Sequence, residues 1–134
     1  MRNKLLIFFS LFLLLVGCRA TIEQRRNMIQ PIPLEKAKWD ARDYEDRVQF
    51  RPGMARKLVF DKSLIGKSRT EIIEMIGEYE ESHDSSPNII RYGLEAIWGW
   101  NIDPIAIEYL KIYFDSENKV EKAEIEFHKT GDWR

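Results

Sequence analysis

The C-terminal third of the chain alternates between apolar and polar side chains, and this pattern predicts a β-hairpin. Residues 105–114 and 120–128 alternate with a period of two, which is typical of antiparallel strands with one covered and one wet face. The segment 115–119, Asp-Ser-Glu-Asn-Lys, is rich in turn-forming residues and joins them. A shorter strand is predicted at 88–94, followed by a connection over 95–104.

The alternation also assigns side chains to the two faces of the predicted hairpin. The covered face is apolar, whereas the wet face carries tyrosines and charged residues. The covered face holds Leu110, Ile112, Phe114, Ala123, Ile125 and Phe127, and the wet face holds Tyr109, Lys111, Tyr113, Lys122, Glu124, Glu126 and His128.

Two short helices are predicted before these strands. Pro52 suits the first turn of a helix, where no N–H is needed, and the apolar positions after it favour a helix over about 52–61. Ser68 and Glu71 have the spacing of a capping box and predict the start of a second helix. Gly77 stands at the C-terminal end of that helix, where a residue with positive φ is expected. Helices followed by an antiparallel sheet predict an α+β domain, with two short helices packed on a three-stranded antiparallel sheet.

The N-terminus has the organisation of a secretion signal. Residues 1–4 are short and basic, and residues 5–16 are apolar apart from Ser10. This run is shorter than the roughly 20 residues that a membrane-spanning helix needs, but it has the length of a signal-peptide core. It ends in Leu-Val-Gly-Cys18, which resembles the lipobox of bacterial lipoproteins. The resemblance implies cleavage before Cys18 and attachment of acyl chains such as palmitate to it; the alternative is an ordinary buried cysteine.

Cleavage at that point defines three segments. Pro31 and Pro33 oppose a helix before the domain, so the segment after Cys18 is interpreted as a tether. Residues 35–51 are dense in charge, and both a helical turn and an irregular wrap over the core stay open for them. The segments are a signal peptide (1–17), a lipidated tether (18–34) and a small α+β domain (35–134).

Composition excludes several classes of protein. The 134 residues include 21 basic and 22 acidic side chains, and loss of residues 1–17 would leave 117 residues with a charge of −3. Such a balance gives no electrostatic reason to bind nucleic acid. One cysteine cannot form an intrachain disulfide, and no Cys/His set for a zinc site exists in the sequence.

The order of these motifs resembles the small lipoproteins of the BamE-like group, which have the SmpA/OmlA fold. The family pattern is a Gly and a Ser or Thr that open a helix ending in Leu-Gly, then strands with a Phe-Asp…Lys-Val hairpin. Here Gly66, Ser68 and Gly77 match the first part, although Ile76 replaces the leucine, and residues 113–120 match the hairpin. The proline that usually follows Leu-Gly is missing, and the Trp-rich connection has no family counterpart. The resemblance implies this fold and an envelope location, and it covers about residues 64–127.

Catalytic or metal-binding chemistry is not indicated by the residue pattern. His83 lies in a polar loop and His128 on the wet face, so both are interpreted as surface histidines. Asp43, Glu45 and Asp46 lie close together, but their spacing matches no EF-hand loop, and a solvated charge run is favoured. No phosphate loop, nucleophile elbow or nucleophile–base pair is identifiable. We therefore expect no enzyme activity, no metal and no cofactor.

Binding is indicated instead by large aromatic side chains. Tyr109 and Tyr113 flank Lys111 on one strand face, and Trp98 and Trp100 lie in the connection before it. Aromatic residues are enriched at interaction hot spots, although one of the two tryptophans is also expected to pack on the sheet.

These expectations combine into one hypothesis with one alternative. The first is a non-catalytic interaction module, anchored to membrane lipid through Cys18, with a role in outer-membrane protein assembly or envelope integrity through an unknown partner as the expected function. By resemblance to Gram-negative lipoproteins, Arg19 after the cysteine favours the periplasmic side of the outer membrane over inner-membrane retention. The alternative is a periplasmic binding protein that inhibits a partner enzyme.

Overall fold

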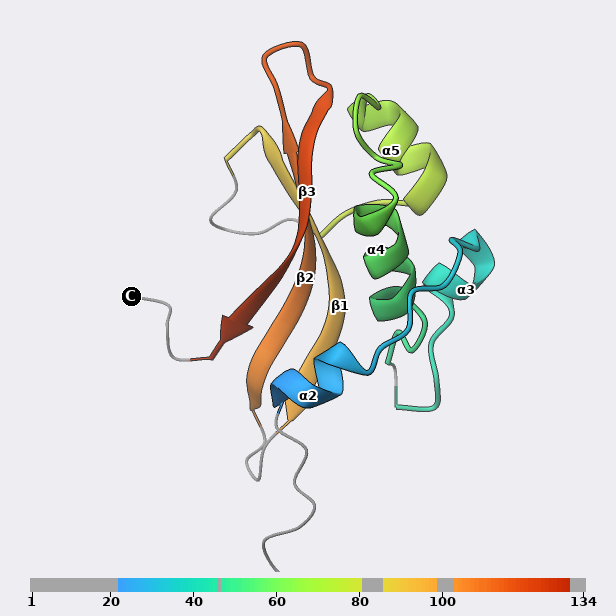
Figure 1. Cartoon of the computed structure of the whole chain (residues 1–134), viewed down its shortest axis with the longest axis vertical. Helices are drawn as coiled ribbons and strands as arrows, with labels where there is room; N and C mark the ends of the chain where they lie inside the picture. The colour runs from blue at the N-terminus through green and yellow to red at the C-terminus, as the bar shows by residue number, and fades with distance from the viewer. Residues whose placement is uncertain (1–21, 46, 81–85, 99–102, 131–134) are drawn as a thin grey trace, which may run out of the picture.

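The computed structural model describes residues 22–45, 47–80, 86–98 and 103–130, and the expectations for Cys18, His83 and Trp100 fall outside these ranges (Figure 1). Within them the chain forms helices and one three-stranded antiparallel sheet, which confirms the predicted α+β class. The described residues form four short helices where two were predicted, because the two N-terminal helices lie in segments that carried no definite helix signal. None of the described helices has the length and apolar composition needed to cross a bilayer. The helices are α2 (Ile22–Asn27), α3 (Lys36–Asp40), α4 (Arg51–Phe60) and α5 (Arg69–Ile76), and the strands are β1 (Ile89–Trp98), β2 (Pro104–Phe114) and β3 (Val120–Lys129).

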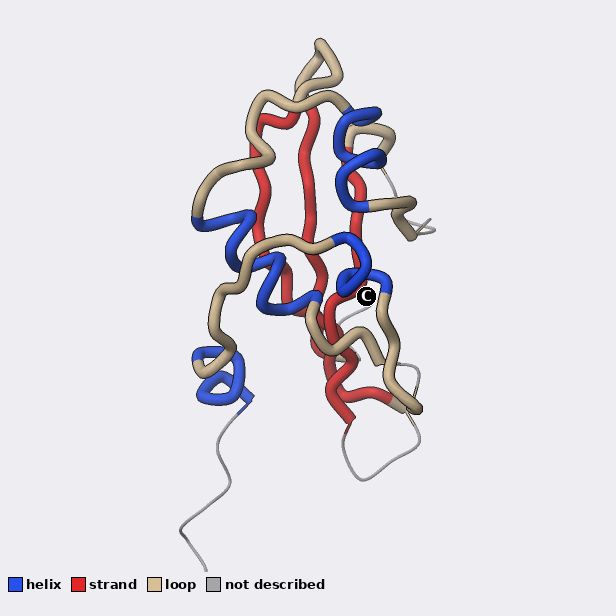
Figure 2. The backbone as a smooth tube through the Cα atoms, turned by 90° about the vertical axis from the view of Figure 1, so that its right-hand side faces the viewer, coloured by secondary structure: helices blue, strands red, loops and turns tan. Residues whose placement is uncertain are grey.

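The helices α3, α4 and α5 cover one face of the sheet, whose strands follow the order β1-β2-β3 (Figures 1 and 2). No described helix covers the other face. The core lies between the two layers and includes Met54 and Leu58 from α4, Ile72 and Ile76 from α5, and Leu110 from β2. We call the helix-covered side of the sheet the covered face and the opposite side the open face.

The ends of α5 follow the predicted signals. The Ser68 hydroxyl accepts the Glu71 backbone N–H at 3.2 Å, and the Glu71 carboxylate accepts the Ser68 N–H at 2.6 Å. The second bond lowers the pKa of Glu71, because it favours the charged carboxylate. Gly77 has a φ of 117°, which only glycine adopts without strain. The predicted helix around Pro52 is confirmed as α4, and within residues 35–50 α3 carries the buried Trp39 and the described residues after it are non-helical.

The strand pairing confirms the two predicted faces of the hairpin. Leu110 pairs with Ile125 and Ile112 with Ala123 on the covered face, while Tyr109 pairs with Glu126 on the open face. The prediction that the first strand ends at residue 94 is wrong, because β1 continues to Trp98. A bulge between Gly93 and Glu95 inserts one extra residue, which breaks the alternation in the sequence while pairing with β2 continues.

The described part of the expected tether lies against the domain rather than free of it. The Ile32 N–H donates to the Gly53 carbonyl at 3.1 Å, and Ile32 and Leu34 pack on the core. Gly53 permits this approach, since a Cβ there would lie 2.8 Å from the Gln30 carbonyl oxygen. Pro31 and Pro33 still exclude a helix here, but the apolar side chains of Ile32 and Leu34 pack this segment against the core.

Candidate functional site

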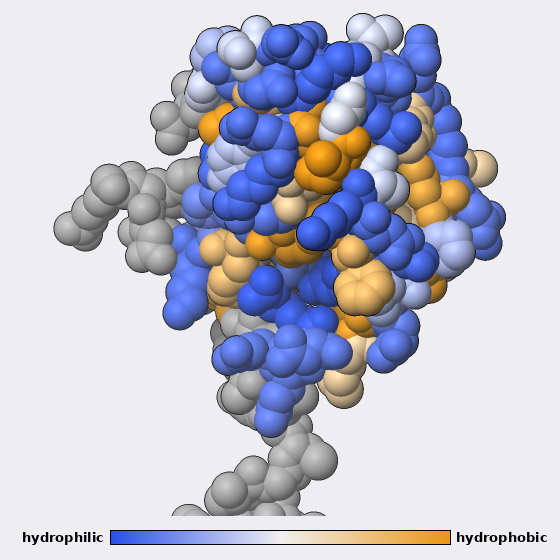
Figure 3. Space-filling model, turned by 45° about the horizontal axis from the view of Figure 1, so that its top comes forward, coloured by the Kyte–Doolittle hydropathy of each residue, from blue (hydrophilic) through white to orange (hydrophobic). Residues whose placement is uncertain are grey.

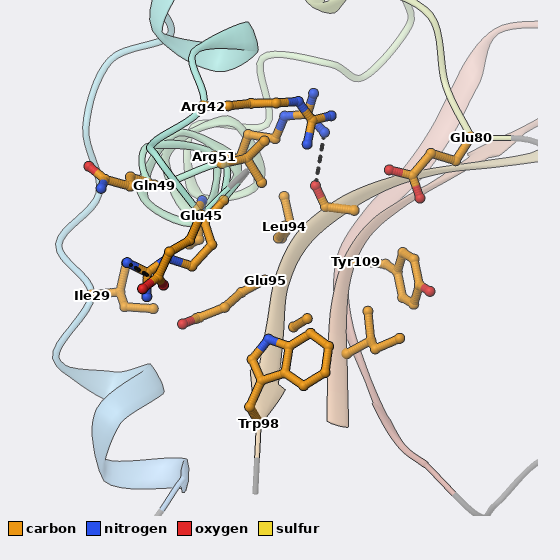
Figure 4. Close-up of a pocket in the computed structure, with 16 residues that line it drawn as sticks. Ile29, Arg42, Glu45, Gln49, Arg51, Glu80, Leu94, Glu95, Trp98 and Tyr109 are labelled. Carbon is orange, nitrogen blue, oxygen red and sulfur yellow. Dashed lines mark hydrogen bonds and ion pairs between the residues drawn. The ribbon is translucent and has the colours of Figure 1, made fainter. Parts of the chain in front are cut away.

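A groove of about 780 Å³ runs beside β1 in its second half, beyond Gly93 (Figure 4). One wall is formed by Arg42, Glu45 and residues 47–49, and the other by β1 and the neighbouring part of β2. Trp98 lies at the end of β1 and Tyr109 comes from β2, so large rings line the groove on the sheet side. The groove therefore gathers apolar, aromatic and charged groups on an accessible surface.

At the Gly93 end of the groove, other segments of the chain contact the edge of β1. The Glu80 N–H donates to the Arg91 carbonyl at 3.2 Å, and Arg51 donates from Nη1 to the Gly93 carbonyl at 3.1 Å and from Nε to the Trp39 carbonyl at 2.9 Å. A Glu80 carboxylate oxygen lies 2.8 Å from where a Cβ of Gly93 would be, so the Glu80 side chain packs closely over the backbone of β1 at this crossing. Burial lowers the pKa of Arg51. Beyond these contacts, toward Trp98, the edge of β1 lines the groove.

On the open face, the predicted patch of Tyr109, Lys111 and Tyr113 is present as a half-buried set of side chains. The Lys111 ammonium lies 5.2 Å from the centre of the Tyr113 ring, which is a cation–π distance. Tyr113 donates its hydroxyl to Glu124 at 2.6 Å, and the Tyr109 ring meets His128 edge-on with a centroid separation of 6.0 Å. We call Tyr109, Lys111 and Tyr113 the tyrosine patch.

Glu126 holds the charges of the open face together. It accepts from Lys111 at 2.7 Å and from Arg91 at 3.2 Å, and His128 Nε2 lies 3.1 Å from it. Burial alone would raise the pKa of Glu126, but the hydrogen bonds from Lys111 and Arg91 outweigh it, and the pKa is lowered. The tyrosine patch is therefore set in a network of ion pairs that remains partly in contact with water.

Of the two tryptophans of the predicted connection, the structure describes Trp98 alone. Trp98 is 57% exposed, so of this pair the described residue does not pack in the interior. The interior ring is Trp39, which is 1% exposed and meets Tyr92 edge-on at 5.8 Å. Trp98 is displaced from the core because it comes after the bulge, at the end of β1 where no core helix covers the sheet.

A buried carboxylate on the covered face was not anticipated. Glu108 is fully buried, and it accepts from Arg26 Nε at 2.7 Å and from Arg56 Nη2 and Nη1 at 3.1 and 3.2 Å. Its cross-strand partner Glu95 lines the groove, and partial desolvation there together with the negative charge of Glu108 raises the pKa of Glu95. A signal was available, because the period-two pattern places position 108 in the apolar register of Leu110.

The acidic segment 43–46 forms a turn in its described part. Asp43 accepts the backbone N–H of Glu45 at 2.8 Å and of Arg47 at 2.9 Å, and it also accepts from the side chains of Arg47 and Gln49. The Arg47 and Gln49 bonds hold the pKa of Asp43 well below its usual range. In the part of the chain that the structure describes, no three His, Cys, Asp or Glu side chains gather as they would around a metal ion.

The chain matches no protein-family model, no curated protein and no solved structure. The resemblance to the BamE-like group therefore depends on the quoted motifs and on the order of the elements.

Proposed function

We propose that the protein is a lipid-anchored envelope lipoprotein that acts as a non-catalytic interaction module of the BamE-like kind. Its sequence begins with a basic segment, an apolar run and a lipobox ending at Cys18. The elements after it follow the order of that group: a helix, the capped helix α5, and a three-stranded meander. These two features support an outer-membrane location with the domain on the periplasmic side.

The observation that carries the interaction role is that the groove and the tyrosine patch meet at one residue. Tyr109 lines the groove and also belongs to the patch, so the groove beside the second half of β1 adjoins the patch, whose residues pair with the first half of β1. Aromatic and arginine side chains on such a surface are the groups that dominate binding energy at interfaces. Arg42 and Arg47 line the same groove. A segment of an envelope protein is the partner that we propose for this surface.

The anchor is tested by labelling cells with a radioactive fatty acid. The wild-type chain should incorporate the label, and Cys18→Ser should abolish incorporation, because the thiol is the acceptor. Labelling that persists in Cys18→Ser would contradict the anchor.

The interaction role is tested by photo-crosslinking in intact cells, with a photoreactive amino acid at Tyr109. The matched control position is Phe60, which is 79% exposed but lies outside the groove. Recovery of a subunit of the barrel-assembly machinery from position 109 alone supports the assembly role. Recovery of a soluble hydrolase would support an inhibitor instead, and equal adducts from both positions would contradict a specific surface.

A further inference from the structure

Three exposed apolar side chains belong to segments at the end of the sheet beside α2. Met28 follows α2 and is 63% exposed, Trp98 ends β1 and is 57% exposed, and Ile105 lies at the start of β2 and is 40% exposed. The residues come from segments far apart in the sequence, yet α2 and these strand ends occupy the same end of the molecule (Figure 1). We call this set the anchor-proximal end. Figure 3, tilted so that the α5 end comes forward, shows polar groups around an apolar patch. Phe60 at the end of α4 and Ile65 before α5 are also exposed, so exposed apolar side chains are not confined to the anchor-proximal end.

The chain also leaves the domain toward Cys18 at this end. Cys18 precedes Ile22 by four residues, so their Cα atoms are at most about 14 Å apart. An acylated Cys18 would therefore hold the bilayer within that distance of α2. The anchor-proximal end is the part of the domain that such a short connection brings nearest to lipid.

The helix α2 is held to the sheet by an ion pair between the partly exposed Arg26 and the buried Glu108. Arg26 Nε donates to Glu108 at 2.7 Å, and the Arg26 guanidinium lies 4.5 Å from the centre of the Phe127 ring. Arg56 from α4 holds the same carboxylate, so Glu108 joins α2, α4 and β2. We call this contact the Arg26 latch. The latch prevents the short α2 from rotating freely between the lipid anchor and the domain.

We propose that the anchor-proximal end rests on the bilayer surface, with the Trp98 indole at the level of the lipid headgroups, and that the Arg26 latch sets this orientation. The proposal rests on the lipid anchor of the proposed function. An indole ring is amphipathic and favours the interface between water and hydrocarbon. The groove beside β1 then opens at a fixed height above the membrane.

The interaction of the anchor-proximal end with the bilayer is expected to depend on apolar side chains rather than on charge. The exposed charges around this end include two cations, Arg25 and Lys129, and two anions, Glu23 and Asp103. Their signs balance, so a basic patch of the kind that selects anionic lipid is not formed by them. The contact should therefore form equally on zwitterionic and on anionic membranes.

The test uses the lipidated full-length mature chain, reconstituted into phosphatidylcholine vesicles whose acyl chains carry bromine, a short-range quencher of tryptophan fluorescence. Trp100→Phe and Trp133→Phe form the background, so that Trp98 and the buried Trp39 are the fluorophores. We expect strong quenching that is lost with the further change Trp98→Phe. Vesicles with added phosphatidylglycerol should give the same quenching.

The Arg26 latch is tested by Arg26→Gln in that background, with Arg25→Gln as the matched control for lost charge near the anchor. Arg26→Gln should keep the fold, because Arg56 still holds Glu108, and should lose much of the Trp98 quenching. Arg25→Gln should change neither. Equal quenching in both variants would overturn the role of the latch.

The failure of this inference differs from the failure of the proposed function. A chain that incorporates fatty acid but shows no quenching of Trp98 overturns the surface contact and leaves the anchor standing. A chain that incorporates no fatty acid overturns both.

Discussion

The two faces of the sheet each hold a glutamate between cations, but they hold it in opposite environments. Glu108 on the covered face is buried beneath α2 and α4 and is held by Arg26 and Arg56. Glu126 on the open face keeps 20% of its side chain exposed and is held by Lys111 and Arg91. The same chemistry is therefore placed once around a fully buried carboxylate and once around a carboxylate that stays partly in contact with water.

The difference teaches which ion pairs hold the fold and which are available for recognition. When one partner of a buried pair is lost, the other is left as an uncompensated charge away from water, which destabilises strongly. Charges at the surface are solvated again when a partner is lost, so such a pair contributes little to stability. The covered face is thus built for stability, and the open face can present its side chains to a partner at low energetic cost.

The largest expected effect on this comparison comes from the apolar side chains of the covered face. Leu110→Ala should lower the free energy of unfolding by about 2–5 kcal/mol, because Leu110 is fully buried and the change leaves a cavity in the core. Ile107→Ala on the open face is the matched control and should have a clearly smaller effect, since Ile107 is only half-buried. Urea unfolding followed by circular dichroism measures both. Equal losses would show that the open face is also part of a core.

The buried carboxylate gives the next largest effect. Glu108→Gln should lower the free energy of unfolding by about 3 kcal/mol, because the amide leaves two arginines without a counter-charge. Glu126→Gln should lower it by about 1 kcal/mol or less at neutral pH. Urea unfolding of both variants checks the difference. A Glu126→Gln loss as large as that of Glu108→Gln would contradict the division between the faces.

Much of this division could be predicted from local sequence patterns. The strict alternation around Leu110 identified both faces of the hairpin, and Ser68, Glu71 and Gly77 marked the ends of α5. These signals depend on residues close together in the sequence, so they can be recognised without knowledge of the tertiary structure. The tyrosine patch was predictable for the same reason.

Other features depend on contacts between residues far apart and could not be predicted in this way. Arg26 and Glu108 are separated by 82 positions, and nothing local links them. The bulge at Gly93 hid the second half of β1, and with it the edge that lines the groove. Trp39 and Trp98 are the same residue type, but only the helix layer decides that the first is buried and the second exposed.

The tyrosine patch offers a smaller effect on stability and a larger one on binding. Replacing both Tyr109 and Tyr113 by Ser should leave the chain folded, with a loss of about 1–2 kcal/mol for the half-buried rings. Capture of the envelope partner in a pull-down should weaken, because the rings are the proposed contact. Circular dichroism and pull-down are measured on the same preparation. Unfolding of the double variant would show instead that these rings belong to the core.

The smallest effects are those of pH, and they have opposite signs for Glu126 and Glu95. The pKa of Glu126 is lowered from its ordinary value of 4.5, so between the two pKa values the unfolded chain binds more protons than the folded one. The stabilisation from Glu126 is therefore fully present above pH 4.5 and is lost as the pH falls through the folded pKa. The pKa of Glu95 is raised instead, so its ionisation destabilises the fold as the pH rises through the folded pKa.

The two variants Glu126→Gln and Glu95→Gln should therefore shift stability in opposite directions at neutral pH. Glu126→Gln should be less stable than the wild type and Glu95→Gln more stable, each by about 1 kcal/mol or less. Both differences should shrink as the pH is lowered below the ordinary glutamate pKa, where the wild-type carboxylates become protonated in both states. Urea unfolding at several pH values resolves the two signs. Changes of the same sign in the free energy of unfolding would mean that Glu126 on the open face and Glu95 in the groove have the same environment. The proposed difference between these two environments would then be wrong.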